Sequence, residues 1–205
     1  MIGITGILIA LIALTIVLAA VFLVRPSFTV GTAGKVLAFV ALCILPALCI
    51  TTGMSTQMQR SESVKFCTTC HAMENYGKSL YIDDPKYVPA QHFQNHRVPA
   101  DTACYACHAD YSLYGPMKDK LRGLSRIYFQ YVTAPPKTIH IDGGYSSQQC
   151  LRCHAGARSF AENPVHLALM DQLKSNQLSC ISSGCHDSVH NAAEVDRQKM
   201  WSLAQ

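Results

Sequence analysis

Two long apolar runs occupy the first fifty or so residues of the chain. Ile2–Val24 contains no charged side chain, and a second run extends from about Val36 to Ile50. Small residues and Lys35, whose amine can reach water at the end of its alkyl stem, lengthen the second run at its start. Because about 20 apolar residues let a helix cross the hydrocarbon layer of a bilayer, we predict transmembrane helices at about 2–24 and 33–52, the second kinked by Pro46.

The charges around the first run argue against a cleaved signal peptide. Such a peptide opens with positive charge and ends in a small-residue cleavage site, whereas here no Lys or Arg precedes the run and Arg25 follows it. The link between the runs carries Arg25 and Lys35 and no acid, so it is expected on the cytoplasmic side. Both termini then lie outside the cytoplasm. A buried core helix is the alternative for the second run.

The chain after Ser55 has many turn signals and few long apolar stripes, so its residues alone would bury only a small core. Three segments have helical patterns: 116–132, 164–177 and 190–203. In the first, one stripe at spacings of three and four is apolar and much of the rest is basic. The stripe is Met117, Leu121, Leu124, Tyr128 and Tyr131, and the basic residues are Lys118, Lys120, Arg122 and Arg126. This helix either lies on a membrane surface or covers haem edges with its basic side solvated.

Cysteine spacing supplies the chemistry. Eight of the ten cysteines lie in four motifs: CTTCH (67–71), CYACH (104–108), CLRCH (150–154) and CISSGCH (180–186). The first three have the spacing of a c-type haem attachment site, in which two thiols add to the porphyrin vinyl groups and the adjacent histidine meets the iron. Zinc sites need no histidine directly after each second cysteine, and disulfides need no histidines at all.

The fourth motif has four residues between its cysteines, and we expect a bulged loop to attach a fourth haem there. The predicted attachment residues are therefore Cys67, Cys70, Cys104, Cys107, Cys150, Cys153, Cys180 and Cys185, with His71, His108, His154 and His186 beside them. Cys43 and Cys49 fall in the second apolar run and are most simply packing residues.

Covalent haem attachment takes place outside the cytoplasm, in agreement with the charge-based orientation. We expect a mainly α fold: a membrane anchor (1–54) with two transmembrane helices, and an extracytoplasmic domain (55–205) of short helices and loops around four haem c groups, with little or no sheet. The formal net charge of +4 is reversed by the propionates of those haems, so it does not point to a nucleic-acid partner.

Five further histidines are available as distal iron ligands: His92, His96, His140, His166 and His190. A lone histidine is usually a surface or hydrogen-bonding group, but a chain with several haems needs such ligands.

These motifs carry a family resemblance. CTTCHAM, HFQNHR before the second site, PVHLAL between the third and fourth, and CHDSVH at the last resemble the NapC/NirT family of membrane-anchored tetrahaem quinol dehydrogenases. The family includes the small anchor subunit of periplasmic nitrite reductase, and the resemblance covers 61 to about 191. It implies that Met73 is a ligand of the first haem and that His92, His166 and His190 are distal ligands of the other three, in an unassigned order. His96 and His140 are left over.

The resemblance also implies a quinol site of a lysine and an acidic residue beside the first haem. Lys120 matches the lysine, but no carboxylate lies between Leu121 and Ile141, and Asp119 is the nearest substitute. The chain departs from the family further in its second apolar run, its widened fourth site and the position of His190, one residue early.

Two functions remain open. The chain is a quinol dehydrogenase component that passes electrons from membrane quinol to a periplasmic redox protein or reductase, or it is an electron-transfer subunit of a larger membrane complex fed by a partner protein. Reduction of nitrite at a catalytic haem would need an open iron position, and the histidines suffice to close three haems. We expect a multi-pass protein of the bacterial inner membrane, in contact with lipid, with the haem domain on the periplasmic side. Assembly into a larger membrane complex or a homo-oligomer is left open.

Overall fold

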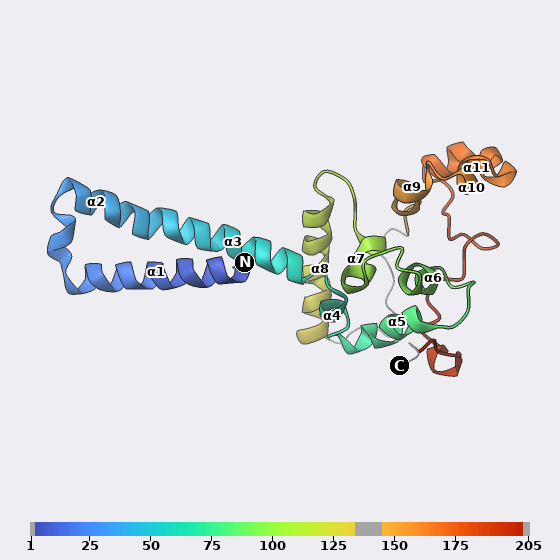
Figure 1. The fold of residues 1–205 in the computed structure, drawn as a ribbon, viewed down its shortest axis with the longest axis horizontal. Helices are drawn as coiled ribbons and strands as arrows, with labels where there is room; N and C mark the ends of the chain where they lie inside the picture. Colours follow the sequence, from blue (N-terminus) through green and yellow to red (C-terminus); the bar gives the residue numbers. More distant parts are fainter. Residues whose placement is uncertain (1–2, 134–144, 203–205) are drawn as a thin grey trace. The chain divides into compact units, whose positions relative to one another are not determined.

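The computed structural model describes residues 3–133 and 145–202. These residues form helices joined by turns and loops, and the only β pairing among them is one isolated bridge between Ile82 and Met200. The prediction of a mainly α fold with little or no sheet is confirmed. The chain divides into two compact units, Met1–Glu62 and Ser63–Gln205, shown in Figure 1.

The first unit is a helical hairpin (Figure 1). It consists of α1 (Ile4–Val24), the 3-10 turn Pro26–Thr29, α2 (Thr32–Phe39), a π-helical turn (Val40–Ile44) and α3 (Leu45–Arg60). Two continuous helices are long and apolar enough to cross a membrane, Ile4–Val24 with a mean hydropathy of 3.3 and Thr32–Arg60 with 2.4. The expectation of two long apolar N-terminal helices is confirmed.

Local chemistry explains both irregular points of the hairpin. Pro46 cannot donate to the carbonyl four residues earlier, and the π-helical turn Val40–Ile44 ends two residues before it. Such π turns absorb a residue without ending a helix. At the link, Gly34 is required because a β-carbon there would overlap the Phe28 carbonyl. The two arms pack together, with Thr15 Oγ1 3.8 Å from Cys49 Sγ.

The second unit is built from short helices. They are α4 (Val64–Cys67), α5 (Glu74–Lys78), α6 (Val88–Gln94), α7 (Ala103–His108), α8 (Gly115–Tyr131), α9 (Gln148–His154), α10 (Arg158–Ala161) and α11 (Pro164–Lys174). Short 3-10 turns lie at His71–Met73, Ser79–Tyr81, Ala100–Thr102 and Val195–Arg197. The largest fully buried side chains described are only Ile82, Val195, Ser79 and Ser147, so apolar packing between side chains is sparse.

The predicted helix at 116–132 is α8, and the one at 164–177 is α11, which ends at Lys174. The predicted helix at 190–203 is wrong: within its described part the chain forms turns and the 3-10 turn Val195–Arg197. Tertiary pairing replaces helical bonds there, because the Trp201 N–H donates to the Tyr81 carbonyl and the Asp83 N–H to the Lys199 carbonyl.

Helix α8 presents its apolar side outward. The whole predicted stripe is exposed, namely Met117, Leu121, Leu124, Tyr128 and Tyr131. Asp119, Lys120, Gly123 and Arg126 are half-buried on the opposite side. The stripe is therefore available to an apolar medium, while the side chains of Lys120 and Arg126 are partly covered.

Candidate haem centres

The second and third motifs each lie on one helix, which explains how their side chains converge. Cys104, Cys107 and His108 lie on α7, which ends at His108. Cys150, Cys153 and His154 lie on α9, which ends at His154. Residues three apart lie on one face of a helix, so both thiols of each motif point to the same side, with the histidine next to them. In the first motif α4 ends at Cys67, and after a short turn the 3-10 turn carries His71 and Met73.

The widened fourth motif is a closed loop. The Ser182 N–H donates to the Ser179 carbonyl, the Cys185 N–H to the Ser182 carbonyl and the His186 N–H to the Cys180 carbonyl, each at 3.0 Å. Gly184 adopts a φ of 82°, which glycine tolerates without strain, and its N–H donates to the Asp187 carboxylate at 3.0 Å. These bonds bend the two additional residues back, so that Cys180 and His186 meet despite the longer spacing.

Three pairs of histidine rings lie close together, one near-parallel, one tilted and one edge-on. The ring centres of His108 and His190 are 6.1 Å apart, those of His92 and His154 are 5.9 Å apart, and those of His166 and His186 are 6.3 Å apart. An imidazole nitrogen lies about 2 Å from a bound metal ion, and the ring centre roughly 1 Å behind it, so rings on opposite sides of one ion have centres about 6 Å apart. Each pair joins the histidine of one motif to a histidine predicted as a distal ligand.

Hydrogen bonds hold the three predicted distal histidines through Nδ1. The partners are the Val88 carbonyl for His92 at 2.8 Å, the Phe160 carbonyl for His166 at 3.3 Å and the Ser79 hydroxyl for His190 at 2.6 Å. A histidine that ligates a metal through one nitrogen is usually fixed in this way through the other.

Electrostatics favour the neutral imidazoles that metal ligation requires. Desolvation, with a smaller contribution from His108, lowers the pKa of His190 to about 4. Desolvation also lowers the pKa of His154, with His92 adding repulsion between the positively charged forms.

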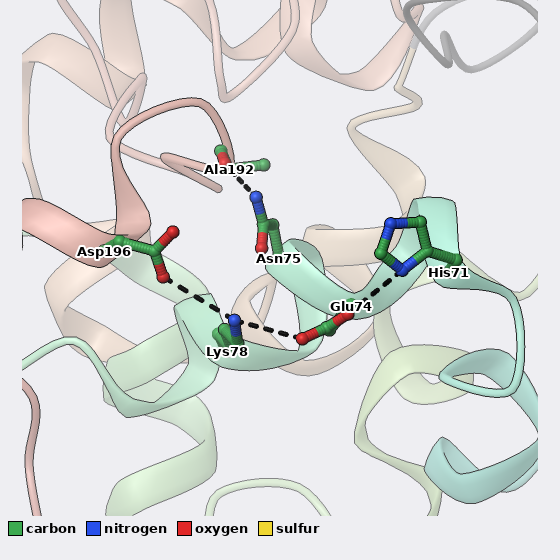
Figure 2. A network of polar contacts seen from close by, with 6 residues as sticks. All are labelled: His71, Glu74, Asn75, Lys78, Ala192 and Asp196. Atoms are coloured by element: carbon green, nitrogen blue, oxygen red, sulfur yellow. Dashed lines mark hydrogen bonds and ion pairs between the residues drawn. The ribbon is translucent and has the colours of Figure 1, made fainter.

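The first motif is arranged differently from the other three. Cys67 and Met73 line a cavity of about 340 Å³, together with Cys104, His108 and His190. His71 lies outside this cavity: its side chain is 94% exposed, and its Nδ1 is 3.2 Å from the Glu74 carboxylate. Figure 2 shows this pair and its extension through Lys78 to Asp196. The structure therefore places Met73, and not His71, at the cavity that Cys67 lines.

The two residues predicted for a quinol site face different surroundings. Lys120 Nζ lies 4.7 Å from the centre of the Tyr105 ring, and its charge contributes to a lowered pKa of Cys67, after the larger contribution of a hydrogen bond with Cys104. The Asp119 carboxylate accepts the Asp110 N–H at 2.6 Å and lines a separate cavity of about 700 Å³. The structure thus places Lys120 toward the first motif and Asp119 away from it.

Thiols of successive motifs lie close together. Cys67 and Cys104 hydrogen-bond to each other, as do Cys150 and Cys180, and the charge of Cys153 raises the pKa of Cys107 after the larger effect of desolvation. Each motif is therefore adjacent to the next one along the chain.

Two histidines remain without a predicted role, and two tyrosines contact residues of the site. His96 is exposed just beyond α6, with a φ of 51°, and it takes part in none of the ring contacts among the described residues. His140 lies outside the described residues. The sequence analysis missed Tyr76, whose ring meets His190 edge-on at 5.5 Å, and Tyr105 beneath Lys120. Tyr105 lies inside CYACH, whereas nothing in the sequence distinguishes Tyr76.

The chain is similar to known proteins. A model of the NapC/NirT cytochrome c family, N-terminal region, matches residues 31–143. The chain is 25% identical over 153 residues to the cytochrome c-type protein NapC of Escherichia coli K12. The match covers 67% of this chain and 72% of the relative. The same protein of E. coli O157:H7 matches to the same extent. No solved structure matches the chain.

Proposed function

Because this chain belongs to the NapC/NirT cytochrome c family, whose members are c-type electron-transfer proteins, we propose that it is a membrane-anchored tetrahaem cytochrome. In this proposal it takes electrons from membrane quinol and passes them to a periplasmic redox protein. The haems supply reversible one-electron chemistry at iron when they are bound.

The residues of the four motifs fit four covalent haems. The thiols would attach them, and three irons would each be held by two imidazoles. Ring geometry supports the assignment of His190 to the second motif, His92 to the third and His166 to the fourth. Met73 is the proposed ligand at the first motif because it lines the cavity with Cys67.

Lys120 is the proposed quinol-binding residue. Oxidation of a quinol releases two electrons and two protons, so the site needs a polarising group and a proton acceptor near the first haem. The Lys120 ammonium would hydrogen-bond a quinol oxygen and so favour loss of its proton. Asp119 or a haem propionate would take that proton; the hydrogen bond from Asp110 to Asp119 makes the propionate the stronger candidate.

The surroundings of Lys120 support quinol access from a bilayer. The exposed apolar stripe of α8 suits the boundary between headgroups and acyl chains, where quinols approach, and the flanking Lys118 and Arg122 suit anionic headgroups. The two apolar helices of the first unit would cross the inner membrane, with a multi-pass topology and the haem unit periplasmic. A mature chain cleaved after α1 would contradict this topology.

The spacing of the motifs supports an electron route in sequence order. Cys67 neighbours Cys104, Cys107 interacts with Cys153, and Cys150 neighbours Cys180. Electrons would enter at the first haem and leave from the fourth, where Cys185 and His186 are exposed toward a soluble partner.

One observation carries the proposal: three motifs each have a second histidine about 6 Å from the motif histidine, while the first has a methionine and a nearby lysine. The test is reduction of the purified, haem-loaded chain in lipid nanodiscs by a reduced quinol analogue. Growth of the reduced haem absorption band without any other protein supports quinol oxidation.

The alternative is an electron-transfer subunit of a larger membrane complex, fed by a partner protein. It is favoured by the lack of a carboxylate between Leu121 and Ile141. In that case dithionite reduces all four haems in the nanodiscs and no quinol analogue reduces any.

A further inference from the structure

Ser79 connects the segment after the first motif to the distal histidine of the second centre. It follows α5 at the start of the 3-10 turn Ser79–Tyr81, and it is 1% exposed. Its hydroxyl oxygen lies 2.6 Å from His190 Nδ1 and 2.6 Å from the Tyr76 carbonyl oxygen.

The two contacts determine which atom donates in each. A serine hydroxyl has one proton and two lone pairs, and a carbonyl oxygen can only accept. The hydroxyl proton therefore goes to the Tyr76 carbonyl, and His190 Nδ1–H donates to the Ser79 oxygen. This fixes the Nδ1–H tautomer, in which the lone pair lies on Nε2, the nitrogen available to a metal.

The rest of α5 holds the same loop in place. The Tyr76 ring meets the His190 ring edge-on, and Asn75 Nδ2 donates to the Ala192 carbonyl, two residues beyond His190, at 3.0 Å (Figure 2). The ring of His190 is thus held in orientation by its neighbours as well as by the hydroxyl.

We propose that Ser79 is a positioning residue that orients His190 toward the second haem and sets the potential of that haem. This inference rests on the proposed ligation by His190. A hydrogen bond accepted from Nδ1–H makes the imidazole a stronger donor, which favours the oxidised iron. Because the hydroxyl is itself polarised by its bond to the Tyr76 carbonyl, its accepting strength is increased.

The three paired centres differ in the group that accepts a hydrogen bond from Nδ1 of the distal histidine. His92 and His166 donate from Nδ1 to backbone carbonyls, which no side-chain substitution removes. His190 alone of the three depends on a side chain, so the second centre is the one whose potential a conservative mutation can change.

The test is Ser79→Ala in the full-length, haem-loaded protein, followed by potentiometric titration and EPR of the oxidised low-spin haems. The haem identified by His190→Met should shift its EPR signal. At a fixed potential its ratio of reduced to oxidised iron should rise roughly tenfold, equal to ~59 mV for a one-electron couple. Ser79→Thr keeps the hydroxyl and should restore both readouts.

Ser147→Ala is the matched control. Ser147 is also fully buried; its hydroxyl donates to the Leu178 carbonyl and accepts the Cys180 N–H of the fourth motif, and its hydrogen bonds with the described residues include none to a histidine of the second centre. This variant should leave the second haem unchanged. A Ser79→Ala protein with four haems and an unaltered signal and potential, while His190→Met alters both, would overturn the role of Ser79 alone. An unaltered His190→Met protein would overturn the ligation itself.

Discussion

The first cysteine–histidine motif and the other three carry the same kinds of residue in different surroundings. At the second, third and fourth motifs the motif histidine lies beside another histidine, with ring centres 5.9 to 6.3 Å apart. At the first motif His71 points to solvent, and Met73, with Lys120 and Tyr105 nearby, occupies its place at the cavity.

We propose that the difference reflects different roles of the first centre and of the other three in electron transfer. In the proposed assignment, two histidines would hold each of the three irons in both redox states, which suits electron transfer. Met73 would favour the reduced iron relative to imidazole, which suits acceptance of electrons from a weak reductant. The predictions below test whether this contrast is real.

The largest expected effect is the loss of a whole haem. Intact-mass measurement of the purified chain should exceed the polypeptide mass by four haems, with nothing beyond Met1 removed. Replacing both Cys180 and Cys185 by Ser removes the thioethers of the widened loop and should reduce the count to three. A wild-type count of three would mean that CISSGCH attaches none.

The distal histidines should each control one haem. Replacing His92, His166 or His190 by Met should raise one potential by about 0.2–0.3 V, a fraction of the roughly 0.8 V range that axial ligands span. Potentiometric titration with EPR checks this. His96→Met is the control and should leave every low-spin haem in place. Loss of a ligand in His140→Met but not in His166→Met would reject the proposed pairing.

Lys120 should affect only the first centre. Lys120→Met should lower the rate of haem reduction by a quinol analogue at least about tenfold, a barrier change of roughly 1.4 kcal/mol, while dithionite still reduces all haems. Stopped-flow absorbance measures the rate. Lys118→Met is the matched control, because Lys118 is exposed on the same helix and pairs with Asp110. A full rate in Lys120→Met, or equal losses in both variants, would remove the site from Lys120.

The loop of the fourth centre should depend on its glycine. Gly184 has a φ of 82°, where a side chain costs about 1–2 kcal/mol, although no other atom lies close to its β position. Gly184→Ala should therefore lower the melting temperature by about 2–8 °C. Gly156→Ala also has open space but no positive φ, and it should change the melting temperature little. Equal shifts in both would contradict the strain.

The smallest effect concerns Lys78, which pairs with Glu74 at 3.1 Å and Asp196 at 3.6 Å (Figure 2). The pair lowers the pKa of Glu74 and raises the pKa of Lys78. The contribution of Glu74 is therefore lost as pH falls through its lowered pKa, and that of Lys78 as pH rises through its raised pKa, so both are present at neutral pH. Lys78→Met should lower the melting temperature slightly at pH 7 and not at all in 1 M salt. A loss that persists in high salt would indicate packing instead.

Much of this architecture could be predicted from the sequence, but not which histidines lie beside each other. Apolar runs are local, so Ile4–Val24 and the long second helix could be predicted, and the covalent spacing of the motifs is local too. Which histidine faces which depends on tertiary contacts between distant segments, as for His108 and His190. The error at 190–203 has the same cause, because pairing of that segment with Tyr81 and Asp83 overrides its helical pattern. Ser79 gave no signal, since one serine resembles any other.

The contrast between the first centre and the other three is tested most directly by near-infrared magnetic circular dichroism of the fully oxidised, purified chain. The energy of the charge-transfer band distinguishes two imidazole ligands from a thioether. The account predicts three low-spin haems with two histidine ligands each and one haem with methionine ligation. A spectrum with four haems that each have two histidine ligands would contradict the contrast. So would a spectrum with fewer than three such haems.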